Sequence, residues 1–345
     1  MSVPQTVARP EPAPATGARA EAQPGVPAVE VRDLVKIYPR PGGGTLRAVD
    51  GISFEVGQGE FFGFLGPNGA GKTTTLEIIE GLRRPTSGEV RVLGVDPRRE
   101  LDQVKRLIGV QLQAAWYFSL LTLEEMLALF GSFYPKRRPP AELLATVGLT
   151  DQRRAYVRQL SGGQQHRFSV AAALVNDPEV LFLDEPTTGL DPQMRHSLWD
   201  LLRRLNRDEG KTIVLTTHYI EEAELLADRV AIIDHGRIAA IDSPRSLIGT
   251  LDGLGHIEFA TPRRIDNADL GRLPGITRVE STGNGVEPGS AAPATYRLAV
   301  SEPKAAVGAL LDWSDRAGVE LRGLEVVPGS LEDVFLELTG RELRD

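Results

Sequence analysis

The chain has 345 residues, is 41% hydrophobic and carries a formal net charge of −8 with no cysteine. This length predicts about two domains with sizeable cores, and the lack of cysteine excludes disulfide bonds and thiolate metal sites. The acidic balance argues against a surface that binds nucleic acid. No apolar run approaches the roughly 18 residues of a membrane span, and no apolar signal segment is evident. We therefore expect a cytoplasmic protein that does not itself cross a bilayer.

The first part of the chain predicts a disordered extension followed by antiparallel strands. Residues 1–27 are rich in Pro and Ala, and such a segment buries too little apolar surface to offset the entropy lost on ordering. Residues 29–35 and 52–56 alternate apolar and polar side chains, which predicts two paired strands. Glycines 42–44 predict a loop tip between them, and Tyr38 lies close to that tip.

Residues 66–73 read Gly-Pro-Asn-Gly-Ala-Gly-Lys-Thr and fit the phosphate-binding pattern G-x-x-x-x-G-K-[ST]. A strand-like apolar run at 61–65 precedes them and helical apolar spacing at 76–82 follows, which is the context that such a loop requires. Its glycines let successive backbone N–H groups point at one anion. Lys72 can then reach the β- and γ-phosphates, and the Thr73 hydroxyl can bind Mg²⁺. The candidate nucleotide-binding residues here are Gly66, Pro67, Asn68, Gly69, Ala70, Gly71, Lys72, Thr73 and Thr74.

The middle of the chain predicts a strand and two helices. An apolar strand at 107–110 leads into two glutamines, Gln111 and Gln113. Residues 121–130 have helical spacing, with Thr122 as a plausible N-cap and Glu125 three residues later. A second helix at 166–175 follows the sequence Leu-Ser-Gly-Gly-Gln at 160–164. Small residues at a helix start suit a contact with a phosphate group.

Residues 180–183 are continuously apolar, as expected for a central parallel strand buried on both faces. The run ends at Asp184 and Glu185, and a buried strand end does not carry two carboxylates without a partner cation. An amphipathic helix is predicted at 195–207, a buried strand at 212–217 ending at His218, and a hairpin from 230–234 and 238–241. Alternating strands and helices with polar residues at strand ends predict a parallel, nucleotide-binding sheet.

Beyond Gly249 the pattern changes to that of a small α+β domain covering residues 251–345. Strands are predicted at 255–260, 276–280, 295–300 and 319–327, a helix at 305–313 and a loop at 284–294. Ser330 and Asp333 predict an N-cap pair before a helix at 334–338. No metal, nucleophile or phosphate motif occurs in this segment.

Taken together, the loop at 66–73, LSGGQ at 160–164 and DEPTTGLD at 184–191 resemble the ABC ATPase cassette, in the order that this family shows. The resemblance covers roughly residues 28–250. It implies an α/β P-loop NTPase fold, with a RecA-like core, an antiparallel β subdomain and a helical subdomain at about 114–164. It also implies that Tyr38 stacks on adenine, that Gln113 is the Q-loop glutamine, with Gln111 as the alternative, and that His218 is the switch histidine. The family commonly has another polar residue where His166 stands, and we interpret His166 as a neutral surface substitution.

The resemblance also implies how the site works, with ATP and Mg²⁺ as its ligands. Asp184, Thr73 and Gln113 would hold Mg²⁺, Glu185 would polarise the attacking water, and His218 would contact the γ-phosphate alongside Lys72. In this family the LSGGQ loop of one copy covers ATP bound to another copy. Identical chains would therefore pair into a dimer with two sites, to which each chain would contribute Ser161, Gly162, Gly163, Gln164 and Asp191.

The C-terminal sequence GSLEDVFLELTGRELRD resembles the tail of drug-exporter-type cassettes of the daunorubicin-resistance group. We therefore favour an ATP-hydrolysing export subunit on the cytoplasmic face of the membrane, acting with a separate membrane-spanning permease. An importer subunit with a regulatory C-terminal domain is the first alternative. The second is a soluble, non-transport ABC ATPase. Paired-cassette translation factors would need a second P-loop, and chromosome-type members would need a long coiled coil before LSGGQ.

Overall fold

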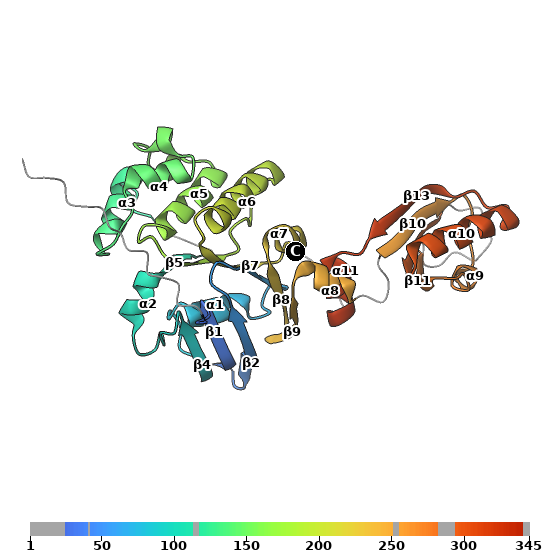
Figure 1. Cartoon of the computed structure of the whole chain (residues 1–345), viewed down its shortest axis with the longest axis horizontal. Helices are drawn as coiled ribbons and strands as arrows, with labels where there is room; N and C mark the ends of the chain where they lie inside the picture. The colour runs from blue at the N-terminus through green and yellow to red at the C-terminus, as the bar shows by residue number, and fades with distance from the viewer. Residues whose placement is uncertain (1–24, 41, 113–116, 251–254, 282–293, 341–345) are drawn as a thin grey trace, which may run out of the picture.

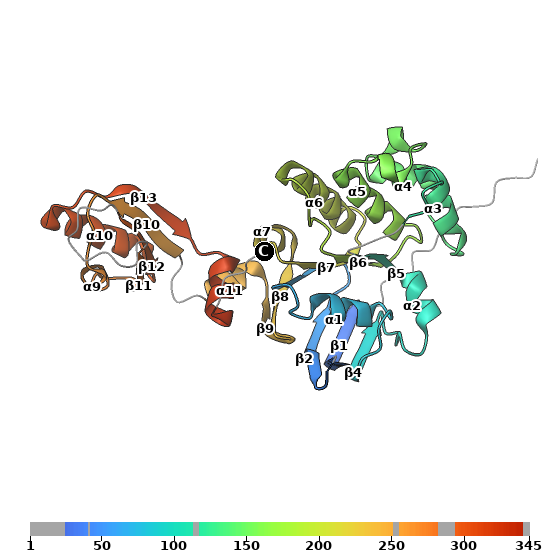
Figure 2. The same ribbon diagram turned by 180° about the vertical axis from the view of Figure 1, so that it is seen from behind.

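The computed structural model describes residues 25–40, 42–112, 117–250, 255–281 and 294–340. Figures 1 and 2 show a larger body, which we call the cassette (residues 25–250), and a smaller accessory lobe (residues 255–328) that projects from one end of it. The expected disordered extension, residues 1–27, falls outside the described part up to residue 24. None of the helices in the described ranges is both long and apolar enough to cross a membrane.

The centre of the cassette is a six-stranded sheet in the order β5-β6-β7-β3-β8-β9. Its strands are parallel except for the β8–β9 pair, which forms the expected antiparallel hairpin. Alternate residues of β6 pack on opposite faces, Leu181 and Leu183 on one side and Val180 and Phe182 on the other, so the prediction of a strand buried on both faces is confirmed. The strands are β3 (Phe61–Leu65), β5 (Ile108–Gln111), β6 (Val180–Asp184), β7 (Thr212–Thr217), β8 (Arg229–Asp234) and β9 (Arg237–Asp242).

A three-stranded antiparallel sheet packs on one side of this central sheet, as the predicted β subdomain. Its strands, in the order β2-β1-β4, are β1 (Val29–Pro39), β2 (Thr45–Val56) and β4 (Ser87–Val92). The rings of Phe54, Phe62 and Phe64 lie within 5.1 to 5.6 Å of one another and join the two sheets. Both predicted strands are confirmed and run further than expected, so that Tyr38 lies near the end of β1.

The helices between β5 and β7 cover the other side of the central sheet, whereas the two helices before β5 pack on the same side as the three-stranded sheet (Figure 1). Thr122 and Glu125 form the expected capping box at the start of α3. The helix after the phosphate-binding loop ends at Ile79, so the prediction that Leu82 lies on its apolar face is wrong, and Leu82 is 57% exposed. The cassette helices are α1 (Lys72–Ile79), α2 (Leu101–Leu107), α3 (Leu123–Ser132), α4 (Pro140–Thr146), α5 (Gly162–Ala173), α6 (Pro192–Arg207), α7 (Ile220–Leu226) and α8 (Pro244–Gly249), with short 3₁₀ turns at Thr150–Gln152 and Val157–Gln159.

The accessory lobe is a four-stranded antiparallel sheet with two helices in the chain order βαββαβ, the ferredoxin-like arrangement. Phe259, Tyr296 and Leu310 are among the buried residues that join its sheet to its helices. All four predicted strands and the helix are present, although the last strand begins at Arg322 rather than at 319. Most of the predicted loop at 284–294 lies outside the described residues. The elements are β10 (Gly255–Thr261), α9 (Asn267–Leu270), β11 (Ile276–Ser281), β12 (Ala294–Val300), α10 (Pro303–Ala317) and β13 (Arg322–Pro328).

The last helix, α11 (Leu331–Thr339), lies against the cassette rather than on the core of the accessory lobe. Ser330 and Asp333 form the expected capping pair at its start. Its apolar side, which includes Phe335, packs with residues of β3, β8, α7 and α8. The backbone N–H of Leu331 also donates a hydrogen bond to Glu224 Oε1 on α7, at 2.6 Å. The sequence assigned this segment to the C-terminal domain, whereas its packing joins it to the cassette.

Candidate functional site

The phosphate-binding pattern forms a loop between the end of β3 and the start of α1, as the sequence predicts. Gly71 has a φ of 107°, and a Cβ there would overlap the carbonyl oxygen of Ala48, so only glycine lets the loop approach β2 this closely. In the described chain no side chain caps α1, whereas Thr122 caps α3 and Ser161 caps α5. Uncapped N–H groups at a helix start favour an anion.

Lys72 is buried, with 4% of its surface exposed, and holds the loop together from within. Its Nζ donates hydrogen bonds to the carbonyl oxygens of Gly66 and Pro67, at 2.6 and 3.2 Å, and lies 3.5 Å from Glu185 Oε1. Burial lowers the pKa of Lys72, and the charge of Glu185 acts in the opposite direction. A buried ammonium held by neutral carbonyls and one carboxylate can accommodate further negative charge.

Asp184, the last residue of β6, is hydrogen-bonded to the start of α1 and to the end of β7. Its Oδ1 accepts hydrogen bonds from Thr73 Oγ1 at 3.0 Å and from Thr216 Oγ1 at 2.5 Å. Burial raises the pKa of Asp184, and the two threonine hydroxyls oppose that shift. Thr73 and Asp184, both predicted to hold Mg²⁺, are thus hydrogen-bonded to each other, and their part in metal binding stays a prediction. The sequence did not identify Thr216, although a threonine beside His218 at the end of a buried strand was the available signal.

The oxygens of Thr73 and Asp184 are the hard donors that Mg²⁺ prefers. The described residues contain no group of three or more His, Cys, Asp or Glu side chains that could hold a metal ion. The described residues therefore do not form a site in which side chains alone supply the ligands of a metal ion. Their donors fit an ion that brings its remaining ligands with it, as phosphate oxygens and water do for Mg²⁺.

Glu185 follows Asp184 in a constrained backbone conformation, with a φ of 48°. A residue with a Cβ costs of order 1–3 kcal/mol in this region and needs its surroundings to hold it. Its N–H donates to the side-chain and main-chain oxygens of Thr216, at 3.0 and 3.2 Å. Its carboxylate accepts from Thr188 Oγ1 at 3.1 Å and lies 3.4 Å from His218 Nδ1. The structure thus gathers Lys72, Glu185 and His218 at one edge of the central sheet.

Tyr38 is half-buried near the end of β1, with two cationic side chains close to its ring. Lys36 Nζ lies 5.0 Å and Arg83 Cζ 5.5 Å from the centre of its ring, distances that suit cation–π contacts. Adenine stacking stays a prediction for Tyr38.

The LSGGQ sequence forms the start of α5. Ser161 caps the helix and shares a capping box with Gln164. A Cβ on Gly163 would overlap the sulfur of Met194, so this glycine is fixed by the close approach of α6. Gly162 has open space around it. Asp191 caps α6 by accepting from the N–H of Met194 at 2.9 Å, and its part in ATP hydrolysis stays a prediction.

The two candidate glutamines differ in what the structure describes. Gln113 lies outside the described residues, so its predicted part in catalysis and in metal binding stays a prediction. Gln111, the alternative, is the last residue of β5 and is 5% exposed. Its Oε1 is buried without a hydrogen-bond partner among the described residues.

His166 is not the surface substitution that the sequence suggested. It lies half-buried on α5, and its Nδ1 is 2.7 Å from the carbonyl oxygen of Pro186, the residue after Glu185. The earlier interpretation was wrong because this contact joins segments 20 residues apart, which no local pattern reveals.

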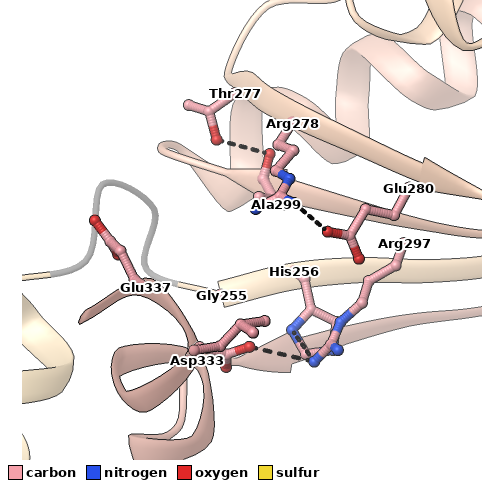
Figure 3. A pocket seen from close by; sticks show the side chains of 11 residues that line it. Gly255, His256, Thr277, Arg278, Glu280, Arg297, Ala299, Asp333 and Glu337 are labelled. Carbon is pink, nitrogen blue, oxygen red and sulfur yellow. Dashed lines mark hydrogen bonds and ion pairs between the residues drawn. The ribbon is translucent and has the colours of Figure 1, made fainter. Parts of the chain in front are cut away.

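A cavity of about 350 Å³ lies away from these residues, between the accessory sheet and α11 (Figure 3). Its charged side chains pair across it and beside it. Arg297 lies 3.3 Å from Asp333 on α11, and Arg278 lies 3.1 Å from Glu280 on its own strand. Its lining comes from β10, β11, β12 and α11, so this cavity marks the junction of the lobe with α11.

Comparison with known proteins gives relatives of similar length. The family described as ABC transporter matches residues 49–188. The chain is 39% identical over 327 residues to the daunorubicin/doxorubicin resistance ATP-binding protein DrrA of Streptomyces peucetius, covering 92% of this chain and 94% of that protein. It is also 39% identical over 332 residues to the Nod factor export ATP-binding protein I of Ralstonia nicotianae, covering 92% and 96%.

Solved structures match the cassette part. An ATP-binding cassette solved as a dimer in a post-hydrolysis state, bound to ADP and Pi, has a TM-score of 0.57 and 31% identity, covering 62% of this chain and 98% of that chain. An ATP-binding subunit of an ABC transporter matches with a TM-score of 0.57 and 28% identity, covering 64% and 92%. The predicted P-loop NTPase fold is confirmed by these similarities.

Proposed function

The chain belongs to the ABC transporter family, and from this membership we propose that it is the ATP-hydrolysing subunit of an exporter that works with a separate membrane-spanning partner. It is an ATPase with an ATP-binding cassette. The observation that carries the proposal is the convergence of Lys72, Asp184, Glu185 and His218, with Thr73 bonded to Asp184, at one edge of the central sheet.

In the proposed reaction, Lys72 exchanges the carbonyls of Gly66 and Pro67 for phosphate oxygens of ATP, because a buried ammonium gains most from a full negative charge. Thr73, Asp184 and Gln113 would hold Mg²⁺ together with the nucleotide, and the ion would supply neutralisation of charge on the β- and γ-phosphates. Glu185 accepts a proton from the water that attacks the γ-phosphorus, the bond from that phosphorus to the β–γ bridging oxygen breaks, and ADP and inorganic phosphate are released.

The surrounding residues fix this geometry in the proposal. His218, 3.4 Å from Glu185 Oε1, bonds to the γ-phosphate and limits the movement of the carboxylate. Thr188 and Thr216 hold Glu185 through its side chain and its backbone. Tyr38 stacks on adenine at the opposite end of the nucleotide.

We further propose that two copies of the chain pair so that residues 161–164 of each cover ATP on the other. The likeness to a cassette solved as a dimer supports this arrangement, and so does the presence of one intact copy of each half-site in the chain. The names of the relatives, which concern drug resistance and Nod factor export, favour export over import.

Exposed apolar side chains support a membrane-spanning partner. Phe118 and Leu120, shortly before α3, are 60% and 82% exposed, and Leu112, directly after β5, is 44% exposed. Large exposed apolar side chains mark an interaction surface when they gather into one patch, and we propose that these three do so. We assign this surface to the permease, which would hold the cassette on the cytoplasmic face of the cell membrane.

The test is the substitution Glu185→Gln, which preserves the shape of the side chain and removes its basicity. ATP binding is expected to persist, while turnover falls about 10²–10⁴-fold because a general base is lost. Turnover and equilibrium nucleotide binding are measured on the same preparation. Glu142→Gln, at an exposed position of α4, is the matched control and should retain wild-type turnover. Near-normal ATP hydrolysis by the Glu185→Gln protein would contradict the assignment of Glu185 as the general base.

A further inference from the structure

His166 links the start of α5, where the LSGGQ sequence lies, to the turn that follows Glu185. It lies on α5, one helical turn beyond the Ser161 cap, and contacts the carbonyl oxygen of Pro186 at 2.7 Å. Because a carbonyl only accepts, Nδ1 must carry the hydrogen. Burial lowers the pKa of His166, while the bond to Pro186 raises it. A neutral imidazole protonated at Nδ1 satisfies the contact.

The hydrogen bond from His166 to Pro186 bears on the backbone of Glu185. Pro186 directly follows Glu185, whose φ of 48° must be held by its surroundings. Thr216 holds the N-terminal side of Glu185 through its N–H. On the C-terminal side of Glu185, the bond from His166 holds the second peptide along, between Pro186 and Thr187.

The first turns of α5 are also fixed to α6. Gly163 packs against Met194, and Arg167 donates a hydrogen bond to Ser197 Oγ. These two contacts reach α6, whereas His166 reaches the turn beside Glu185. Ser161 and His166 are five residues apart on one helix, a rigid distance of roughly 7 Å. Movement of the helix start is therefore transmitted directly to that turn.

We propose that His166 is a positioning residue that couples the two ATP sites of the dimer. The inference rests on the proposed function, in which residues 161–164 act on the partner's ATP while Glu185 acts on the chain's own ATP. Closure of the helix start over one nucleotide then sets the carboxylate that hydrolyses the other. The two hydrolysis events are linked within each chain.

The first test compares His166→Ala with His166→Asn in the full-length chain. Asn places an N–H close to the position of Nδ1, so it should retain the bond that Ala loses. A single hydrogen bond of about 1 kcal/mol predicts a fall in kcat of roughly 3- to 10-fold for His166→Ala. KM and the melting temperature should change little, and His166→Asn should recover most of the loss. Equal rates for all three proteins overturn the proposal. So does an equal loss in both variants.

The second test separates coupling from local support of Glu185. A heterodimer of a Lys72→Ala chain and a Ser161→Arg chain holds one working site, which uses Glu185 of the Ser161→Arg chain and the LSGGQ loop of the other chain. His166→Ala is added to one chain at a time. Coupling predicts that His166→Ala in the chain that supplies Glu185 lowers the rate less than it does in the wild-type dimer, because the helix start of that chain is already blocked, and that it has little effect in the other chain. A loss as large as in the wild-type dimer shows local support of Glu185 alone and overturns coupling.

A third experiment distinguishes failure of the proposed function from failure of the coupling. ATP should drive the Glu185→Gln protein into a dimer on size-exclusion chromatography. If it stays a monomer, the dimer and the coupling are both overturned. If it dimerises and His166→Ala changes neither rate nor heterodimer activity, only the coupling is overturned.

Discussion

At the scale of single residues, the site is defined by charges that the protein has buried before any nucleotide arrives. Lys72, Asp184 and Glu185 are each less than a tenth exposed. Isolated, each would be costly to bury, but they lie within reach of one another and of threonine hydroxyls. Such an arrangement is stable enough to fold and is ready to exchange its internal partners for a charged substrate.

Glu80 is a buried carboxyl that the proposed reaction does not use. It lies just after α1, is 3% exposed, and burial together with the charges of Asp184 and Glu77 raises its pKa to about 8. Between about pH 4.5 and 8 the folded protein keeps a proton that the unfolded chain releases. The stability that this proton provides is complete below pH 4.5 and is lost as pH rises towards 8.

We therefore expect Glu80→Gln to stabilise the nucleotide-free protein increasingly from pH 5 to pH 8. The gain over wild type should grow by up to about 1.4 kcal/mol per pH unit. Melting temperatures across this range measure it, with Glu89→Gln at an exposed position of β4 as the matched control. A difference between Glu80→Gln and wild type that does not vary with pH would contradict the ionisation of Glu80.

At the scale of elements, the sequence predicted what local patterns determine. The apolar run of β6 and the capping boxes of α3 and α11 each carry their signal within a few residues, and all three are present. Short helices such as α7 and α9, of seven and four residues, were not predicted because so few turns give no periodicity. The roles of Lys72 and Thr73 came from the phosphate-loop pattern, whereas those of Tyr38, Gln113 and His218 were inferred from the family resemblance.

What the sequence could not provide was contact between distant segments. Thr216 beside Asp184, His166 beside Pro186, and α11 on the cassette all depend on tertiary packing. A glutamate at the end of an amphipathic helix, as at Glu80, gives no sign in sequence that it is buried. These are the features for which the structure adds most to the motifs.

Packing of α11 predicts a test at the scale of this element. Phe335 is fully buried against residues of β3, β8 and α8, whereas Leu338 on the same helix is 45% exposed. Phe335→Ala should cost about 3–5 kcal/mol of unfolding free energy, because it leaves a cavity in a closed core. Leu338→Ala is the matched control and should cost far less. Equal effects on the urea unfolding midpoint of the cassette would show that α11 is not part of its core.

At the scale of the whole molecule, one chain holds two halves of a site that the proposed dimer brings together. The P-loop is at the edge of the central sheet, and LSGGQ is at the start of α5 on the helical side. An isologous pair of chains contains two such composite sites. Loss of either half in both chains should therefore abolish hydrolysis at both sites.

Mixing inactive chains tests this pairing. Lys72→Ala removes the side chain proposed to bind phosphate, and Ser161→Arg blocks the start of α5. Each protein alone should therefore be inactive. Random pairing of equal amounts should restore at most about a quarter of the wild-type rate, since half the dimers hold one intact site in two and coupling between the sites slows a site that works alone. The mixture is assayed beside each protein alone. No recovery in a mixture whose heterodimers are shown to form would count against sites shared between chains.

The return of α11 to the cassette makes the accessory lobe an insertion rather than an appendage. The chain leaves the cassette after α8 and comes back at α11, which packs against α8 itself. The exit and the return are therefore neighbours in space. A short linker from Gly249 to Ser330 could replace the lobe and leave every buried side chain of the cassette in place. Another folded module with adjacent ends could occupy the same position, so the lobe is exchangeable in a way that its location near the C-terminus conceals.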